Sequence, residues 1–282
     1  MSEGLLWQHL MQQIEREISS VPAVAGVAVL DLHAGQEIAV HGDEVFPTAS
    51  TIKIHILAQL FRRAEAGELD LSRRVPVTAS LHAPGSGVLT YLDDTEQLTV
   101  RNLATLMIIV SDNTATNLCI DWATPEGTNA MLQHLGLEKT RLRRKMQDHQ
   151  AVLKGDENTA TPREIVTFLK ELHQPQRLSR YVCEETLRIL KKPKRGFLMN
   201  GLPIGVEMAN KPGAMDRVRC DAGIVYLKRR PYAICVMTKF GLDHPSLQEE
   251  FIGAVARLTH THMTALDTTS SYGQGVAPEL LR

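Results

Sequence analysis

Residues 204–239, IGVEMANKPGAMDRVRCDAGIVYLKRRPYAICVMTK, decide the fold class of this 282-residue chain. They contain three runs rich in Val, Ile, Tyr and Met, which are residues typical of β-strands. The runs are Ile204–Lys211, Gly223–Arg229 and Tyr232–Lys239, and Lys228–Pro231 predicts a turn that joins the last two into a hairpin. This region therefore predicts neighbouring strands of an antiparallel sheet.

The N-terminal part of the chain supplies the other strands of the predicted sheet. Val24–Leu30 and Gln36–His41 are typical of a strand pair around a turn at His33–Gly35. Apolar residues at helical spacing predict a helix over residues 4–19, and a last helix is expected over about 246–262. One sheet is therefore expected to be built from both ends of the chain.

Helical signals fill the chain between these strand regions. A helix from about Ser50 to Ala66 is expected to end at Gly67, a natural C′ residue. A capping box with proline at the first helical position predicts another helix start at Thr161-Pro162-Arg163-Glu164. The expected fold is α/β, an α+β sandwich with an antiparallel sheet flanked by helices and an inserted all-helical lobe. The predicted domains are 1–44 with 203–282 for the sheet, and 45–202 for the helical lobe.

Composition and charge narrow the classes of partner. A hydrophobic fraction of 43% and a charged fraction of 22% are those of an ordinary soluble globular protein. With a net charge of −1, the chain lacks the excess of positive charge that is typical of nucleic-acid-binding proteins. No segment approaches the roughly 18–20 unbroken apolar residues of a membrane span. A small-molecule substrate is expected, with no nucleic acid and no membrane as partner, and the oligomeric state is left open.

The N-terminus and the cysteines bear on the compartment. MSEGLLWQHLMQQIERE lacks a basic start followed by an apolar run and a cleavage site, so a cytoplasmic protein is expected. A periplasmic or secreted protein is the alternative if the sequence was trimmed. The four cysteines (Cys119, Cys183, Cys220 and Cys235) form no C-x-x-C pair, and three of them sit among apolar neighbours, as buried free thiols do.

Ser50-Thr51-Ile52-Lys53 opens the helix predicted from residue 50. Residues three apart on a helix share a face, so the amine of Lys53 is expected beside the hydroxyl of Ser50. Unpaired N–H groups in the first turn favour developing negative charge. The apolar residues that follow hold the amine in a poorly hydrated place, which favours a neutral proton acceptor. The pattern predicts a nucleophilic serine with a neighbouring base; the alternative is an N-cap serine with an exposed lysine.

Ser111-Asp112-Asn113 follows an apolar helix that is expected to end at Val110. In the functional interpretation, Ser111 is a proton relay next to the nucleophile, and Asn113 bonds Lys53 or a substrate amide. The alternative is an ordinary cap and turn at the end of a buried helix.

Lys211-Pro212-Gly213 ends the first strand of the C-terminal region. Lys211 is a candidate to attract a substrate carboxylate, and Gly213 allows close approach of a substrate to the backbone. The backbone N–H groups of Ala214 and Ser50 are candidates for a two-donor oxyanion hole. An ordinary lysine at a strand end is the alternative for Lys211.

The order of these motifs resembles the signature of the class A β-lactamases and, more broadly, of the penicillin-binding proteins: S-x-x-K, S-D-N, then K-T-G or K-S-G. Other similar segments are Gly67–Val77, Ser111–Leu118 and Asp156–Pro162, and the similarity spans about residues 23–240. It implies a serine β-lactamase-like hydrolase with a Ser50 acyl-enzyme, a β-lactam-like substrate and a place in antibiotic resistance. It implies no cofactor and no metal, and the eleven histidines form no ligand set.

One departure from the family pattern concerns deacylation. Class A enzymes carry E-x-x-L-N in a loop whose glutamate activates the hydrolytic water. The corresponding stretch here is RRKMQDHQAVLKGDEN, which lacks that motif. Asp148 is the best-placed carboxylate by offset, followed by Asp156 and Glu157.

A second departure is Pro212, where the family has threonine or serine. Proline removes a hydroxyl that helps to hold a substrate carboxylate, and Arg217 or Arg219 is a candidate to compensate. Strand residues two apart point their N–H groups in the same direction. If the N–H of Ala214 points into the site, the backbone nitrogen of residue 212 therefore faces the same open edge of the sheet, where proline is tolerated.

Three functions are left open. The first is a β-lactamase-like hydrolase, with Lys53 removing the serine proton directly or through Asp148 and water. The second is a cytoplasmic esterase, peptidase or transacylase with the same Ser-Lys machinery, acting on an acyl ester or amide. The third is a penicillin-binding sensor that acylates and then deacylates slowly.

Overall fold

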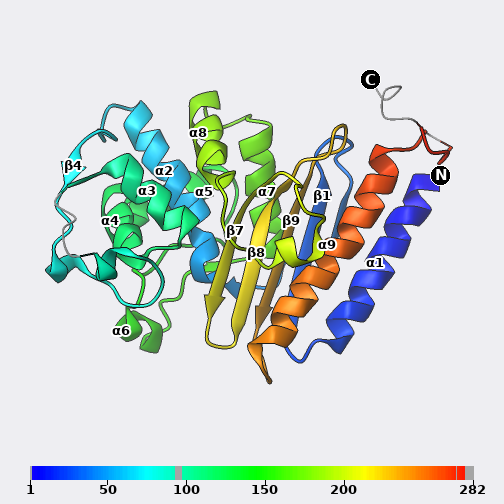
Figure 1. The fold of residues 1–282 in the computed structure, drawn as a ribbon, viewed down its shortest axis with the longest axis horizontal. Helices are drawn as coiled ribbons and strands as arrows, with labels where there is room; N and C mark the ends of the chain where they lie inside the picture. Colours follow the sequence, from blue (N-terminus) through cyan, green and yellow to red (C-terminus); the bar gives the residue numbers. More distant parts are fainter. Residues whose placement is uncertain (1, 93–96, 271, 277–282) are drawn as a thin grey trace. The chain divides into compact units, whose positions relative to one another are not determined.

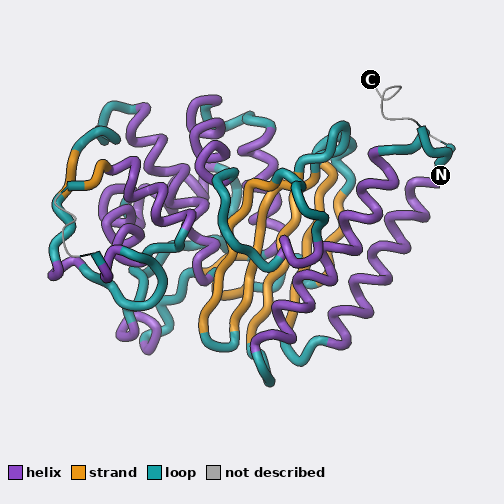
Figure 2. Tube along the Cα trace, in the orientation of Figure 1, coloured by secondary structure: helices purple, strands orange, loops and turns teal. Residues whose placement is uncertain are grey.

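The computed structural model describes residues 2–92, 97–270 and 272–276 of the chain (Figures 1 and 2). The chain divides into two compact units, which we name the sheet unit and the helical unit. The sheet unit comprises Met1–Ala49, Thr161–Lys170 and Arg195–Arg282, and the helical unit comprises Ser50–Ala160 and Glu171–Lys194.

These boundaries differ from the predicted domains in three short segments, residues 45–49, 161–170 and 195–202, all of which belong to the sheet unit. Thr161–Lys170 belongs to the sheet unit, where Arg163 forms an ion pair with Asp43 at 3.0 Å. Residues 195–202 also belong there, because the N–H of Leu198 donates to the buried carboxylate of Asp221 at 3.0 Å. Neither long-range contact has a local sequence signal.

The sheet unit is built on a five-stranded antiparallel sheet with the order β2-β1-β9-β8-β7. Strands from both chain ends therefore meet in one sheet, which confirms the predicted fold class. The strands are β1 (Val24–Asp31), β2 (Glu37–Val40), β7 (Met208–Met215), β8 (Val218–Val225) and β9 (Tyr232–Lys239).

Two strand predictions were wrong in position. The strand predicted over Ile204–Lys211 runs four residues later, and the strand predicted over Gly223–Arg229 begins five residues earlier, at Val218. The predicted turn at Lys228–Pro231 does lie between β8 and β9, which pair as a hairpin up to Val225 and Tyr232. A second turn at Asp216-Arg217 joins β7 to β8, because Met215 pairs directly with Val218. Proline and glycine within β7 lower its strand signal, but β7 lies at the edge of the sheet, where both are tolerated.

Two long helices contact each other in the sheet unit, α1 (Ser2–Ser20) and α9 (Pro245–Asp267) (Figure 1). Their apolar faces share one core with the sheet, in which Leu10 and Ile14 of α1 are fully buried. Further elements of this unit are β3 (Phe46–Pro47) and the 3₁₀ helix η4 (Leu198–Gly201), while α7 (Pro162–His173) begins here.

The helical unit is organised around α2 (Lys53–Glu65), which contacts α8, α4, α5 and α3. Every residue from Lys53 to Phe61 is buried, and the polar side chains among them are Lys53, His55 and Gln59. The other helices are α3 (Val100–Ile109), α4 (Asn113–Ala123), α5 (Pro125–His134), α6 (His149–Leu153) and α8 (Arg180–Leu190). Short strands are β4 (Arg74–Val75), β5 (Leu98–Thr99) and β6 (Thr159–Ala160), and short 3₁₀ helices are η1 (Ala49–Ile52), η2 (Ala79–Leu81) and η3 (Leu89–Tyr91).

Within residues 2–92, 97–270 and 272–276, no helix combines the length and apolar character that crossing a membrane requires.

Candidate active site

Ser50 lies in a single 3₁₀ turn, η1, that runs directly into α2. The residue before it, Ala49, has a φ of 46°, a left-handed conformation that is uncommon outside glycine. The helix predicted from Ser50 therefore exists, with a tighter first turn. Ser50 is half-buried, whereas its neighbours Thr51 and Ile52 are fully buried.

The amine of Lys53 is fully buried and hydrogen-bonded to the Ser111–Asn113 turn. Its Nζ donates to the backbone oxygen of Ser111 at 2.8 Å, to the Ser111 hydroxyl at 3.0 Å and to Oδ1 of Asn113 at 3.3 Å. A buried amine requires such acceptors, because an unpaired one is strongly destabilising. The alternative of an exposed lysine is therefore wrong.

The hydroxyl of Ser111 connects Lys53 to Ser50. Ser111 Oγ donates to Ser50 Oγ at 2.9 Å, which completes a chain of hydrogen bonds from the amine to the predicted nucleophile. Ser111 has a φ of 55°, a strained conformation for a serine. The structure thus brings together four predicted site residues within the helical unit: Ser50, Lys53, Ser111 and Asn113.

The loop around residues 84–89 is fastened to the same turn by Asp112 and Asn113. Oδ2 of Asp112 accepts from the N–H groups of Val88 and Leu89, and Oδ1 caps α4 at Ala115. The backbone N–H of Asn113 donates to Ser86 O at 2.9 Å. Sequence reasoning gave Asp112 no role, although its place in the S-D-N motif was the available signal.

Two buried groups near Lys53 are uncharged at neutral pH. Burial lowers the pKa of His55 to about 4, and an interaction of the ring with the backbone of Ile52 only partly opposes this effect. Burial also raises the pKa of the Cys119 thiol far above its usual range, against the opposing charge of Lys53. Neither group therefore adds a charge to the proton path.

Two of the predicted deacylation carboxylates, Asp148 and Glu157, have other partners in the loop that carries them. Asp148 has an exposed side chain, and its carboxylate caps α6 by accepting from the N–H of Ala151 at 2.9 Å. Glu157 forms an ion pair with Arg144 at 2.7 Å.

Helix α4 is hydrogen-bonded to this loop at Met146. The side-chain amide of Asn117 accepts from Met146 N at 2.8 Å and donates to Met146 O at 3.3 Å. Asn117 stands one helical turn after Asn113, so the loop residue anchored next to the S-D-N turn carries an apolar side chain.

The other predicted site residues lie in the sheet unit, on the edge strand β7. Lys211 is almost fully buried, and its Nζ donates to Pro212 O at 2.8 Å. Glu207 and Tyr226 form a hydrogen-bonded pair, in which Tyr226 N donates to Glu207 O. Hydrogen-bonded and non-hydrogen-bonded pairs alternate along an antiparallel ladder, so the pairs that contain Pro212 and Ala214 are non-hydrogen-bonded. Backbone groups of Pro212 and Ala214 therefore face away from β8. The N–H of Ala214 is directed to the open edge, where Pro212 removes no bond to β8.

The two arginines suggested for carboxylate binding are bonded elsewhere. The Arg217 guanidinium donates to Gly241 O at 2.9 Å. Arg219 forms an ion pair with Glu249 of α9 at 2.8 Å. Arg219 pairs with Ala214 in the sheet register, so its side chain leaves the face opposite to that of Lys211.

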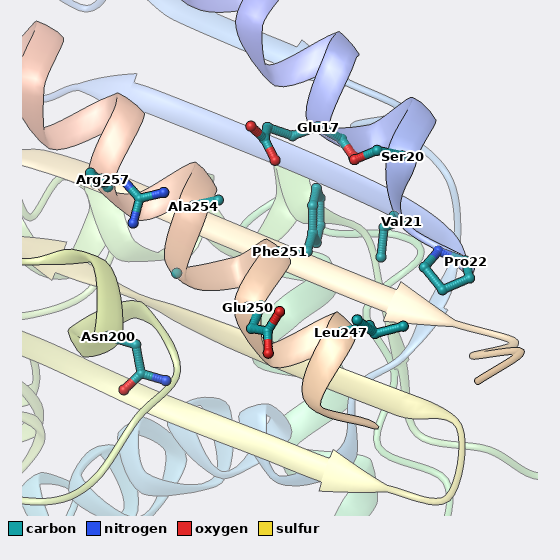
Figure 3. A pocket seen from close by; sticks show the side chains of 11 residues that line it. Glu17, Ser20, Val21, Pro22, Asn200, Leu247, Glu250, Phe251, Ala254 and Arg257 are labelled. Carbon is teal, nitrogen blue, oxygen red and sulfur yellow. The ribbon is translucent and has the colours of Figure 1, made fainter. Parts of the chain in front are cut away.

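Two pockets belong to the sheet unit. One of about 550 Å³ lies between α1 and α9, with Glu17 and Arg257 on its walls, and none of the predicted site residues lines it (Figure 3). A second, of about 430 Å³, is lined by Ala214, Arg217 and Arg219 together with the turn that precedes α9.

Comparison with known proteins identifies the family to which this chain belongs. A model of the beta-lactamase enzyme family matches residues 9–263. The chain belongs to the beta-lactamase enzyme family. It is a class A beta-lactamase-like serine hydrolase, with the mixed α/β fold of that class.

Solved structures of this family cover nearly the whole chain. PBP-A is 32% identical, with a TM-score of 0.81, over 91% of this chain and 96% of PBP-A. A beta-lactamase from Sphaerobacter thermophilus is 29% identical, with a TM-score of 0.84, over 92% of this chain and 98% of that one. A class A beta-lactamase of the last common ancestor of Gram-negative bacteria is 27% identical, with a TM-score of 0.82, over 89% and 98%.

One further structure of PBP-A is an acyl-enzyme complex with penicillin G. It is a Leu-to-Glu variant of PBP-A, 32% identical to this family member, with a TM-score of 0.82 over 91% of this chain and 97% of PBP-A.

Proposed function

We propose that this family member forms an acyl-enzyme on Ser50 by opening a β-lactam amide. The observation that carries the proposal is the hydrogen-bonded chain from Lys53 through Ser111 to Ser50. Ser50 Oγ forms an ester bond with the lactam carbonyl carbon while the carbon–nitrogen bond breaks. The serine proton moves towards Lys53, and Ser111 delivers a proton to the leaving nitrogen.

Substrate binding in this proposal uses the edge of β7. The N–H groups of Ser50 and Ala214 donate to the oxyanion of the tetrahedral intermediate. Lys211 attracts the substrate carboxylate, and Gly213 leaves space for the substrate backbone. Arg217 and Arg219 have no part in it, because their guanidinium groups bond Gly241 and Glu249.

We propose further that the acyl-enzyme deacylates slowly. Hydrolysis of the ester requires a group that activates water, and in the class A pattern that group is the glutamate of E-x-x-L-N. Asp148 is exposed and caps α6, Glu157 pairs with Arg144, and the anchored residue Met146 is apolar. These contacts favour a penicillin-binding protein with a long-lived adduct over a fast β-lactamase.

A second candidate, an esterase, peptidase or transacylase with the same machinery, is favoured by Pro212. Its missing hydroxyl weakens recognition of a lactam carboxylate, which an ester substrate does not need. Steady turnover of p-nitrophenyl esters without any penicillin adduct would support this candidate.

Time-resolved intact mass spectrometry with penicillin G tests the proposal. The wild type is expected to gain one penicillin mass and to keep it over many minutes, whereas Ser50→Ala gains none. Ser80→Ala, at an exposed serine of the helical unit, is the matched control and should label like the wild type. An adduct on Ser50→Ala would remove Ser50 from its role. Rapid loss of the wild-type adduct, abolished by Asp148→Asn, would instead identify Asp148 as the deacylation base.

A further inference from the structure

The pocket between α1 and α9 has no part in the chemistry proposed above, because none of the predicted site residues lines it. Its volume of about 550 Å³ lies within the usual range for small-molecule sites, about 300–1,000 Å³. Its walls come from the end of α1, from α9 and from η4, and α9 contacts both other elements. Figure 3 shows α9 running between Glu17 of α1 and Asn200 of η4. The pocket therefore joins three segments that are far apart in sequence.

The wall that carries Asn200 is fixed by close packing of η4 against α9. A Cβ added to Gly201 of η4 would collide with the backbone oxygen of Gly253, so only glycine allows this approach. A Cβ added to Gly253 would in turn lie 3.3 Å from the Cβ of Asn200. The N–H of Leu198, in the same 3₁₀ helix, donates to the buried carboxylate of Asp221 at 3.0 Å. This wall is therefore held in place without a ligand.

Three charged side chains line the pocket: Glu17, Glu250 and Arg257. None of them forms an ion pair or a side-chain hydrogen bond with any residue in the described ranges 2–92, 97–270 and 272–276. The preceding residue of α9, Glu249, is by contrast paired with Arg219 at 2.8 Å. The pocket thus presents two carboxylates and one guanidinium to a ligand, with one negative charge in excess.

The spacing of Glu250 and Arg257 sets the length of a ligand that could contact both. They are seven residues apart on one face of α9, which places their Cα atoms about 10 Å apart along the helix axis. Gly253 and Ala254 lie between them with little or no side chain, so the space between the two charges is open. Asn200 lines the same space with an amide that can donate and accept at once, as a peptide group does.

We propose that this pocket binds a short basic peptide of about three residues with free ends. An extended chain spans at most roughly 3.3–3.6 Å per residue, so three residues match the spacing of Glu250 and Arg257. The C-terminal carboxylate pairs with Arg257, and the N-terminal ammonium and a basic side chain pair with Glu250 and Glu17. The amide of Asn200 bonds the peptide backbone. The positive charge in excess on the peptide then matches the negative charge in excess on the pocket, whatever the chemistry at Ser50.

Isothermal titration calorimetry with the peptide alanyl-lysyl-alanine tests the proposal. The wild type is expected to bind it with a dissociation constant below about 1 mM. The same peptide with an acetylated N-terminus and an amidated C-terminus lacks both terminal charges, and it should bind at least about fivefold more weakly. Alanyl-glutamyl-alanine, with the side-chain charge reversed, should also bind more weakly. Ser50→Ala is titrated beside the wild type and should give the same constant, which excludes turnover of the peptide at Ser50.

Variants of the pocket assign the contacts. Arg257→Ala and Glu250→Gln should each weaken binding about fivefold, the upper range for an exposed ion pair. Arg257→Ala should have no effect on the peptide amidated at its C-terminus, because that peptide lacks the carboxylate. Ala254→Trp should abolish binding by filling the space. The controls are Arg16→Ala and Gln12→Trp, at exposed positions of α1 that do not line the pocket, and both should bind like the wild type.

Three outcomes would overturn the inference. Absence of binding to the wild type at about 1 mM peptide would show that the pocket has no such ligand. Wild-type affinity in Ala254→Trp would place the peptide elsewhere on the molecule. Equal losses in Arg257→Ala for the free and the amidated peptide would show that Arg257 only shapes the pocket. Thermal midpoints identify any variant that has lost its fold. Each of these outcomes leaves the proposed function of Ser50 unchanged, since penicillin labelling is measured separately.

Discussion

Lys53 couples the fold and the chemistry of the site, because its buried amine donates to oxygens of Ser111 and Asn113. Lys53→Met keeps the length of the side chain and removes the proton acceptor. The labelling rate of Ser50 with penicillin G should fall by about 10²–10⁴, the usual range for general base catalysis.

Lys170→Met, at an exposed lysine of α7, is the control for that substitution. Unchanged labelling of Lys53→Met, in a variant with a wild-type thermal midpoint, would mean that the amine serves only to fasten the Ser111–Asn113 turn.

The buried carboxyl group of Asp221 should make the stability of the sheet unit depend on pH. Burial raises its pKa from 3.8 to about 6, although Leu198 N–H and the Asn210 amide bond the carboxylate. The folded protein therefore binds the proton more tightly than the unfolded chain. The free energy of unfolding should fall as pH rises from about 4 to about 6, by about 3 kcal/mol in total.

Urea unfolding of the wild type and Asp221→Asn at several pH values measures this contribution. In Asp221→Asn the free energy of unfolding should no longer fall between about pH 4 and about pH 6. Asp216→Asn, at an exposed aspartate of the same hairpin, should show the same fall as the wild type. Parallel curves for wild type and Asp221→Asn would contradict the raised pKa.

Single residues also show where sequence reasoning succeeds. Ser50, Lys53, Ser111 and Asn113 were predicted together because each belongs to a short motif at a helix boundary. The anchoring of Met146 beside them was not, since it depends on hydrogen bonds with the side-chain amide of Asn117, 29 residues away in sequence.

Among the elements, helix caps were read correctly from local sequence. Thr161 accepts from the N–H of Glu164 at 3.1 Å, at the predicted start of α7. The positions of β7 and β8 were wrong because an edge strand tolerates Pro212 and Gly213, whereas residues 204–207 look like a strand without forming one.

The loop fastened to Asp112 gives a prediction at the same scale. A Cβ on Gly87 would lie 2.2 Å from Oδ2 of Asp112, and the φ of Gly87 is 123°. Gly87→Ala should therefore destabilise the protein by about 2–4 kcal/mol, through strain and overpacking.

Gly155→Ala isolates the strain alone, because Gly155 has a φ of 85° and nothing within 4 Å of an added Cβ. It should cost about 1 kcal/mol in urea unfolding. Equal effects of the two substitutions would mean that Asp112 moves aside without penalty.

For the whole molecule, both chain ends are needed for one core. Leu10 of α1 is fully buried in the cluster that includes Phe251 of α9 and Val236 of β9. Leu10→Ala should lower the free energy of unfolding by about 2–5 kcal/mol, since it removes apolar contacts and leaves a cavity. Gln12→Ala, on the exposed side of α1, should change it little. A loss below the range for Leu10→Ala would indicate that α1 adds little to this core.

Pro212 has a consequence for self-association. The outer side of β7 is a row of backbone groups to which a strand from another molecule could add, as in aggregation by edge pairing. Proline interrupts that row at its centre, because it offers no N–H to an incoming strand. The protein therefore carries a built-in barrier to polymerisation through this side of its sheet.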